Sequence, residues 1–232
     1  MKDIKDETVD LIITDPPYKV TSRGNAGNSG GMAQDKQFMK GKVFAENDIE
    51  IEQWLPELYR VLKPMGHAYI MTNNKNIGHY LDVIDKSKFH FTKNLIWVKS
   101  NKIMGLYYMG QFEYIIFIHK GKAKKINNNG TSDVLQFPNA KTKDENGKNL
   151  HPTEKPIKMM EVLIENSSDE NDVVLDPFMG VGTTGIAAVN NNRNFVGMEL
   201  DQKYFNIAKK RIDVAENKIQ GKLAGKILEE TI

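Results

Sequence analysis

The chain has 232 residues and a mass of 26.3 kDa; 40% of its residues are hydrophobic and 27% are charged, which excludes a fully disordered chain and fits one globular domain. Its apolar runs are too short for a transmembrane helix, and no apolar segment of signal-peptide type follows Met1. The absence of cysteine excludes disulfides and thiolate catalysis and favours a cytoplasmic protein. The net charge of +2 indicates no particular partner by itself.

The first quarter of the chain predicts a buried strand, a long loop and a helix. Residues 9–14 are mostly apolar and β-branched, and this strand must end at the DPPY segment of residues 15–18 because prolines cannot continue a ladder. Residues 19–47 are polar and rich in glycine, and a loop of this length is usually functional. Residues 48–62 repeat apolar side chains at helical spacing, and the KPMG segment of residues 63–66 ends that helix.

The middle of the chain predicts three further strands and one helix. The strands fall at residues 67–72, 92–98 and 112–119, and the helix falls at residues 76–86. Residues 121–150 hold clusters of asparagine, lysine and glycine, so we expect a loop or a small insertion there.

The last third of the chain alternates helices and strands. Helices are expected at residues 157–166, 183–190 and 202–219, and strands at residues 172–176 and 194–200. Strands that alternate with helices predict an α/β fold with a mainly parallel sheet.

The residues between 99 and 125 form a basic run, with six lysines against one acid, Glu113. Such a run suits contact with phosphates, although a solvated lysine face is the more common explanation. The five histidines show no metal-ligand spacing, so no metal site is expected.

A glycine-bearing turn between a strand and a helix is the first candidate site. It reads Asp176-Pro177-Phe178-Met179-Gly180-Val181-Gly182-Thr183-Thr184. Gly180 and Gly182 permit positive φ and a close approach of a ligand to the backbone, and the following helix offers free N–H groups. Glu199 follows Asp176 by 23 residues, at the end of the next strand, where an acid typically binds ribose hydroxyls. A plain glycine turn is the alternative, but the surrounding pattern favours a nucleoside site.

The DPPY segment is the second candidate site. Pro16 and Pro17 stiffen the loop, which fixes the carboxylate of Asp15, the carbonyl of Pro16 and the ring of Tyr18 relative to one another. This arrangement suits a planar amine, because Asp15 and the Pro16 carbonyl can accept its two hydrogens while Tyr18 stacks on the ring. A Pro-Pro turn with a structural aspartate is the alternative.

Together the two motifs resemble the S-adenosylmethionine-dependent DNA amino-methyltransferases, which methylate adenine N6 or cytosine N4. The order, with DPPY first and the glycine motif last, is similar to that of the permuted β group. Supporting segments are LYRVLKP at residues 58–64, WVK at 97–99, FEY at 112–114, HPTEKP at 151–156 and GME at 197–199. The resemblance covers about residues 4–216, and several short motifs in the right order make coincidence improbable.

The resemblance implies a class I methyltransferase: a Rossmann-like, mainly parallel sheet with flanking helices, circularly permuted motif order and a small insertion. Residues 1–232 would form the catalytic domain, and residues 99–150 within it would recognise the target. Asp15 and Pro16 would hold the amine of a base flipped out of double-stranded DNA. The residues implied in binding S-adenosylmethionine are Asp176, Pro177, Phe178, Gly180, Gly182, Thr183, Thr184, Glu199 (ribose) and Lys155 (near the methionine end).

The implied reaction is direct displacement, with the amine nitrogen, the methyl carbon and the sulfonium sulfur in line. Adenine N6 is favoured over cytosine N4, because Asp at the first position of the tetrapeptide is the commoner adenine pattern in that family. Methyl transfer to RNA or protein stays open as an alternative. A homodimer and a restriction nuclease are the other partners that the family suggests.

One departure concerns the cofactor. The family usually carries a Gly-Asp pair, whose Asp helps bind the cofactor adenine, just before the segment that matches Met1–Ile4, and this sequence begins after that position. We therefore expect weaker cofactor binding unless another acid substitutes, and an inactive DNA-binding homologue is a further alternative.

Overall fold

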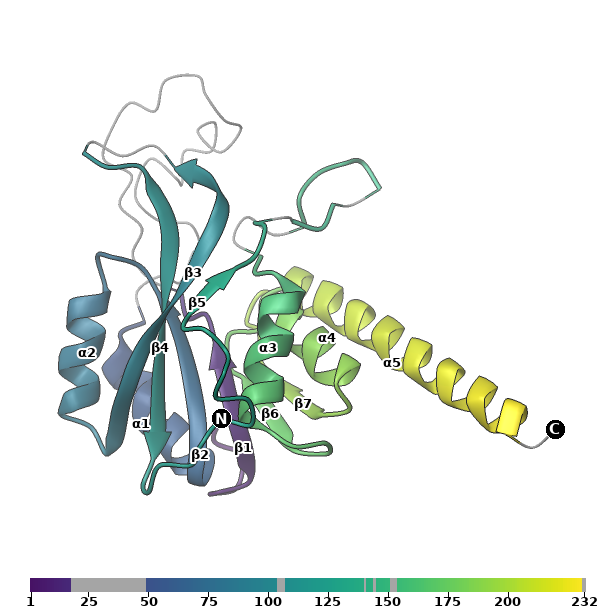
Figure 1. Cartoon of the computed structure of the whole chain (residues 1–232), viewed down its shortest axis with the longest axis horizontal. Coiled ribbons are helices and arrows are strands. Elements are labelled where there is room, and N and C mark those ends of the chain that lie inside the picture. The colour runs from purple at the N-terminus through teal and green to yellow at the C-terminus, as the bar shows by residue number, and fades with distance from the viewer. Residues whose placement is uncertain (18–48, 104–106, 140, 144, 151–153, 231–232) are drawn as a thin grey trace.

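A computed structural model describes residues 1–17, 49–103, 107–139, 141–143, 145–150 and 154–230, with only the backbone for Ile103 and residues 222–230. Seven strands form one sheet in the order β5-β3-β4-β2-β1-β6-β7 (Figure 1). Their bounds are β1 Val9–Thr14, β2 Leu62–Thr72, β3 Phe89–Ile103, β4 Gly110–Lys120, β5 Val134–Gln136, β6 Val173–Asp176 and β7 Asn194–Gly197. The pairs β1–β2, β1–β6, β6–β7 and β3–β5 are parallel, whereas β4 is antiparallel to β2 and β3. The predicted mainly parallel α/β sheet is confirmed.

Helices cover both faces of this sheet. Their bounds are α1 Ile51–Val61, α2 Ile77–Asp85, α3 Ile157–Ser167, α4 Thr183–Asn190 and α5 Gln202–Glu230. One core lies between the sheet and α1 and α2, and it includes Ile12, Trp54 and Ile84. The other core lies between the sheet and α3 and α4, and it includes Leu11, Ile13 and Met160. Successive residues of β1 thus enter opposite cores, as the two-residue period of a strand requires.

Three expectations about element bounds need correction. The strand predicted at residues 67–72 begins already at Leu62, so the KPMG segment belongs to β2 and bulges out where the pairing shifts from Val9–Leu62 to Leu11–His67. The positive φ of Met65, +65°, accompanies the bulge. Strand β7 ends at Gly197 rather than Leu200, and α5 extends beyond residue 219.

The segment 121–150 contains a strand that the sequence did not predict. Strand β5 has only three residues and pairs in parallel with β3 at the sheet edge, so it is too short to show an alternating pattern. The candidate recognition segment, residues 99–150, also contains β4, which lies inside the sheet between β3 and β2. Its role in recognition stays a prediction.

The lysines of the basic run lie at opposite ends of the neighbouring strands β3 and β4. Lys99 and Lys102 belong to the end of β3, and Lys120 ends β4, which runs antiparallel alongside β3 so that Lys120 pairs with Phe89 at the start of β3 (Figure 1). Lys99 is buried against Glu113, and Lys120 is buried and donates to the carbonyls of Tyr59 and Leu62. Lys99 and Lys120 therefore do not belong to a solvated lysine face, and contact of the run with phosphates stays a prediction.

Among the helices that the structure describes, none has both the length and the apolar character that crossing a bilayer requires.

Candidate active site at the strand ends

The two sequence motifs meet at the carboxyl ends of β1 and β6. These strands are parallel neighbours, and Ile12 pairs with Leu175. Just beyond that pair, the Thr14 hydroxyl donates to Oδ1 of Asp176 at 3.0 Å, although the two residues are 162 positions apart. From here the chain crosses from β1 to β2 on one side and from β6 to β7 on the other. Such a switch point in an open α/β sheet is where ligands typically bind.

Asp15, the first residue after β1, has one carboxylate oxygen engaged and one without a partner. Its Oδ2 accepts from the ammonium group of Lys155, whereas Oδ1 is buried and has no hydrogen-bond partner among the described residues. A buried acceptor without a donor costs about 1–3 kcal/mol. Pro16 is buried and Pro17 half-buried beside it. Tyr18, the predicted stacking residue, lies outside the described residues, as does the predicted loop 19–47.

Lys155 belongs to a buried group of alternating charges. Its ammonium lies between the carboxylates of Asp15 and Glu113, 3.5 Å from Oε2 of Glu113. Oε1 of Glu113 accepts from Lys99 at 2.5 Å. Burial acts to raise the pKa of Glu113, but the two lysines hold it below its usual value. Burial acts to lower the pKa of Lys155, but the two carboxylates raise it, so this lysine stays charged.

The family resemblance places Lys155 near the methionine end of the cofactor, and that role stays a prediction. The structure adds ion pairs of Lys155 with Asp15 and Glu113. Glu113 and Lys99 were not predicted as site residues. The sequence shows them as an acid within a basic run, and only the register of β3 and β4 brings them to the end of β1.

Asp176 is buried and fully engaged by groups of the protein. Oδ1 accepts from the Thr14 hydroxyl and from the backbone N–H of Phe178 at 3.1 Å, and Oδ2 accepts from the Thr184 hydroxyl at 2.7 Å. Burial raises the pKa of Asp176 to about 6, although these hydrogen bonds oppose the shift. Asp176 and Thr184 thus fasten β1, β6 and the start of α4 to one another, and neither Asp176 oxygen is left without a donor.

The glycine turn has the backbone that the sequence predicts. Gly180 has φ +53° and Gly182 has φ +79°, in the left-handed region that favours glycine. A Cβ atom at Gly182 would lie 2.9 Å from the Cβ of Ala208 in α5, so the position also excludes a side chain. Thr183 opens α4 and is buried. The turn therefore presents bare backbone and the N-terminus of α4 at the strand ends.

Glu199 closes the glycine turn from the side of β7. Its Oε2 accepts from the N–H of Gly180 at 3.0 Å, and its Oε1 accepts from the N–H of Asp201 at 2.9 Å. A carboxylate has about four acceptor positions, so two remain for ligand hydroxyls. Pro177 is buried, and Phe178 packs edge-on against Trp54 of α1 with ring centroids 5.8 Å apart.

Arg211 of α5 joins the two halves of the site, and the sequence reasoning missed it. Its guanidinium donates to the carbonyl of Val181 in the glycine turn at 2.7 Å and to Oε1 of the buried Glu154 at 2.6 Å. Glu154 also accepts from the N–H of Thr142 at 2.7 Å and directly precedes Lys155. The amphipathic pattern of α5 places Arg211 on a helix, but no local signal reveals these distant partners.

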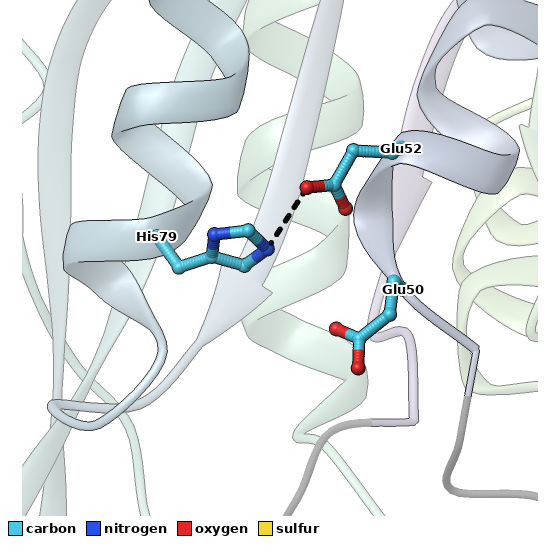
Figure 2. A group of neighbouring side chains, drawn as sticks. All are labelled: Glu50, Glu52 and His79. Carbon is cyan, nitrogen blue, oxygen red and sulfur yellow. Dashed lines mark ion pairs between the residues drawn. The ribbon is translucent and has the colours of Figure 1, made fainter.

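A second group of charged side chains lies at the start of α1 and α2. Figure 2 shows Glu50, Glu52 and His79 facing one another, with 3.3 Å between Nε2 of His79 and Oε1 of Glu52. All three are exposed, and exposed acids of this kind are common on protein surfaces. The sequence spacing of the histidines did not indicate this group, because its members come from two helices.

Comparisons with known proteins agree with this geometry. A family model described as DNA methylase, for the N6 and N4 methyltransferases, matches residues 9–210. The chain is 33% identical over 233 residues to the type II methyltransferase M.HinfI of Haemophilus influenzae, covering 91% of this chain and 65% of that protein. It is similar in structure to the M1.HpyAVI–SAM complex, with a TM-score of 0.65 and 30% identity over 91% of this chain and 90% of that one.

The PvuII cytosine-N4-specific DNA methyltransferase shares the fold, with a TM-score of 0.67 at 17% identity over 94% of this chain and 88% of that one. The fold and the strand-end site thus define a class I, Rossmann-like methyltransferase. The chain belongs to the N6/N4 DNA methylase family.

Proposed function

We propose that this chain transfers a methyl group from S-adenosylmethionine to the exocyclic amine of a base flipped out of double-stranded DNA, with adenine N6 as the target. The observation that carries this proposal is the junction of the two motifs: the free oxygen of Asp15 and the bare glycine turn lie at the ends of adjacent strands. Asp15 after β1 offers a hydrogen-bond acceptor for an amine, and the glycine turn after β6 offers bare backbone for a nucleoside.

The residues at the turn fit the cofactor. Gly180, Gly182 and Thr183 would carry the methionine part against bare backbone at the start of α4, and Glu199 has acceptor positions left for the ribose hydroxyls. Asp176 and Thr184 would act by holding the turn in place, since the Asp176 oxygens are already engaged. Pro177 and Phe178 would line the pocket beside them. When bound, S-adenosylmethionine supplies an electrophilic methyl group on a sulfonium centre.

The residues after β1 fit the amine. Oδ1 of Asp15 would accept one amine hydrogen and the Pro16 carbonyl the other, which directs the nitrogen lone pair away from the ring. Pro17 would stiffen the turn, and Tyr18 would stack on the base. Catalysis of this kind comes from positioning and from preorganised acceptors.

The preference for adenine rests on the aspartate at the first position of the tetrapeptide. Because a cytosine-N4-specific enzyme shares the fold, the architecture alone does not choose between the two bases. Recognition of a specific DNA site, a nuclease partner of the kind that accompanies type II methyltransferases, and a homodimer belong to the same proposal.

Sequencing with detection of modified bases, on DNA from cells that express the chain, tests this function. We expect N6-methyladenine at one recurring sequence, and its loss in cells that express the Asp15→Ala variant. N4-methylcytosine in its place would overturn the choice of base. Unmodified DNA, together with methyl transfer to RNA or protein by the purified chain, would overturn the choice of acceptor.

A further inference from the structure

A row of four charged side chains leads from β3 to the end of β1. Lys99 on β3 contacts Glu113 on β4, Glu113 faces Lys155, and Lys155 contacts Asp15. The side chains of Lys99, Glu113 and Lys155 are only 8%, 17% and 5% exposed. The two positive and two negative charges cancel, so the row is neutral as a whole.

Such a row is unusual as a stabilising device. Removing charges from water is costly, and a buried ion pair often contributes less to stability than an apolar contact of the same size. Buried charge networks are retained where they fix a geometry or a protonation state. This row ends on Asp15, whose Oδ1 has no hydrogen-bond partner among the described residues; within the row, Oε2 of Glu113 also has none and faces Lys155 at 3.5 Å.

We propose that Glu113 and Lys99 are positioning residues for methyl transfer: they fix Lys155, and Lys155 holds Oδ2 of Asp15 so that Oδ1 faces the target amine. This inference rests on the proposed function and deepens it, because it assigns roles to two residues for which the sequence predicted none. It also moves Lys155 from the cofactor to the carboxylate that binds the base.

The charges that face Asp15 from the surrounding elements act in opposite directions. Burial raises the pKa of Asp15; Lys155 and, more weakly, Lys99 lower it, whereas Glu113 raises it. Asp176 at the end of β6 and Tyr80 on α2 also lie within electrostatic reach of Asp15. An ionised carboxylate accepts hydrogen bonds through both oxygens, whereas a protonated one has less acceptor capacity. Lys155 therefore favours the ionised, accepting form of Asp15 and opposes the larger rise in pKa that burial causes.

The test is the pH profile of the single-turnover methyl-transfer rate in Lys155→Met and Glu113→Gln. For Lys155→Met we expect a rate loss of about 100-fold and an acidic limb at higher pH, since the lysine lowers the pKa of Asp15. For Glu113→Gln we expect a loss of about tenfold and an acidic limb at lower pH. If the two substitutions only lowered stability, the acidic limbs of the two pH profiles would not shift in opposite directions. Limbs that move together would overturn the proposal.

The double variant Lys155→Met/Glu113→Gln tests whether the residues act in series. If Glu113 acts through Lys155, its replacement in the Lys155→Met background should cause almost no further loss. Losses that multiply would overturn the proposal. Lys155→Gln provides a second substitution in case the methionine variant does not fold.

The exposed ion pair between Lys86 and Asp82 supplies matched controls. Lys86→Met and Asp82→Asn remove the same charges as Lys155→Met and Glu113→Gln, but from side chains that are 71% and 57% exposed. Neither control should change the methyl-transfer rate or the acidic limb of its pH profile. A titration of the Asp15 carboxyl carbon by ¹³C NMR, assigned with Asp15→Asn, follows the same pKa directly without methyl transfer. A wild-type protein without methyl-transfer activity would refute the proposed function. Opposite changes in the pKa of Asp15 in the two variants would still support the positioning role of Lys99, Glu113 and Lys155. Equal changes, or no change, in that pKa would refute the positioning role.

Discussion

Two carboxylates stand at the ends of neighbouring strands, the half-buried Asp15 and the buried Asp176, and their surroundings differ. Asp176, the last residue of β6, receives three hydrogen bonds from a backbone N–H and two hydroxyls, all within the protein. Asp15, after β1, contacts a charged lysine through one oxygen and has no donor on the other. Both stand on rigid strand ends, and both have a raised pKa because of burial.

This difference gives Asp176 a structural role and Asp15 a role in the reaction. A carboxylate with protein donors on both oxygens holds its own loop in place, whereas one with a donorless oxygen is prepared for a donor that the described part of the protein lacks. We therefore expect changes at the end of β1 to affect the reaction, and changes at the end of β6 to affect cofactor binding and stability.

The largest effect should follow from Asp15→Asn. The amide is a weaker acceptor and carries no charge, so we expect the methyl-transfer rate to fall by about 10²- to 10⁴-fold. The dissociation constant for S-adenosylmethionine, measured by calorimetry, should stay close to that of the wild type. A parallel loss of cofactor binding would contradict the separation of the two strand ends.

Arg211→Met should cause the largest loss of stability. It leaves the buried Glu154 carboxylate without its cation, and breaking such a pair costs about 3–5 kcal/mol. Chemical denaturation measures the change, and we expect weaker cofactor binding as well, because Arg211 also holds the carbonyl of Val181. Lys209→Met removes an exposed ion pair from the same helix and should change stability by less than about 1 kcal/mol.

Gly182→Ala should weaken the binding of S-adenosylmethionine and leave the residues that hold the amine unchanged. The left-handed φ and the overlap with Ala208 should together cost about 2–4 kcal/mol of unfolding free energy and reduce cofactor affinity. Gly78→Ala is the matched control, because a Cβ at this exposed position in α2 meets nothing within 4 Å and alanine favours a helix. Equal effects of the two changes would show that the turn does not require glycine.

The smallest effect concerns the pH dependence of stability. Because burial raises the pKa of Asp176 from 3.8 to about 6, its stabilising contribution is complete below about pH 3.8 and is lost as the pH rises through about 6. Asp176→Asn removes this titration. Relative to wild type, the variant should therefore gain up to about 3 kcal/mol of unfolding free energy between pH 4 and pH 8. An unchanged difference across this range would show that Asp176 titrates normally.

The comparison also shows how far the sequence leads. Residues 9–14 and 172–176 were predictable as strands, because apolar β-branched runs end there at an Asp-Pro pair. The turn at Gly182 was predictable because its pattern of residues is local. Both strand ends at the site were therefore predictable from local sequence.

The features that the sequence did not predict depend on contacts between residues far apart in the chain. The contact of Glu113 with Lys155 requires the register of β4 and the position of the segment before α3, and neither is encoded nearby. Strand β5 is too short to show a period. Arg211 acts through partners 30 and 57 positions away. Side chains that join two halves of a site are thus the part that a single sequence does not reveal.

The most direct test of the division between the strand ends is the single-turnover methyl-transfer rate at saturating S-adenosylmethionine, for Asp15→Asn and Gly182→Ala side by side. We expect the glycine variant to recover most of the wild-type rate as the cofactor saturates, and the aspartate variant to stay slow at every concentration. Recovery of the aspartate variant, or failure of the glycine variant to respond, would contradict the account.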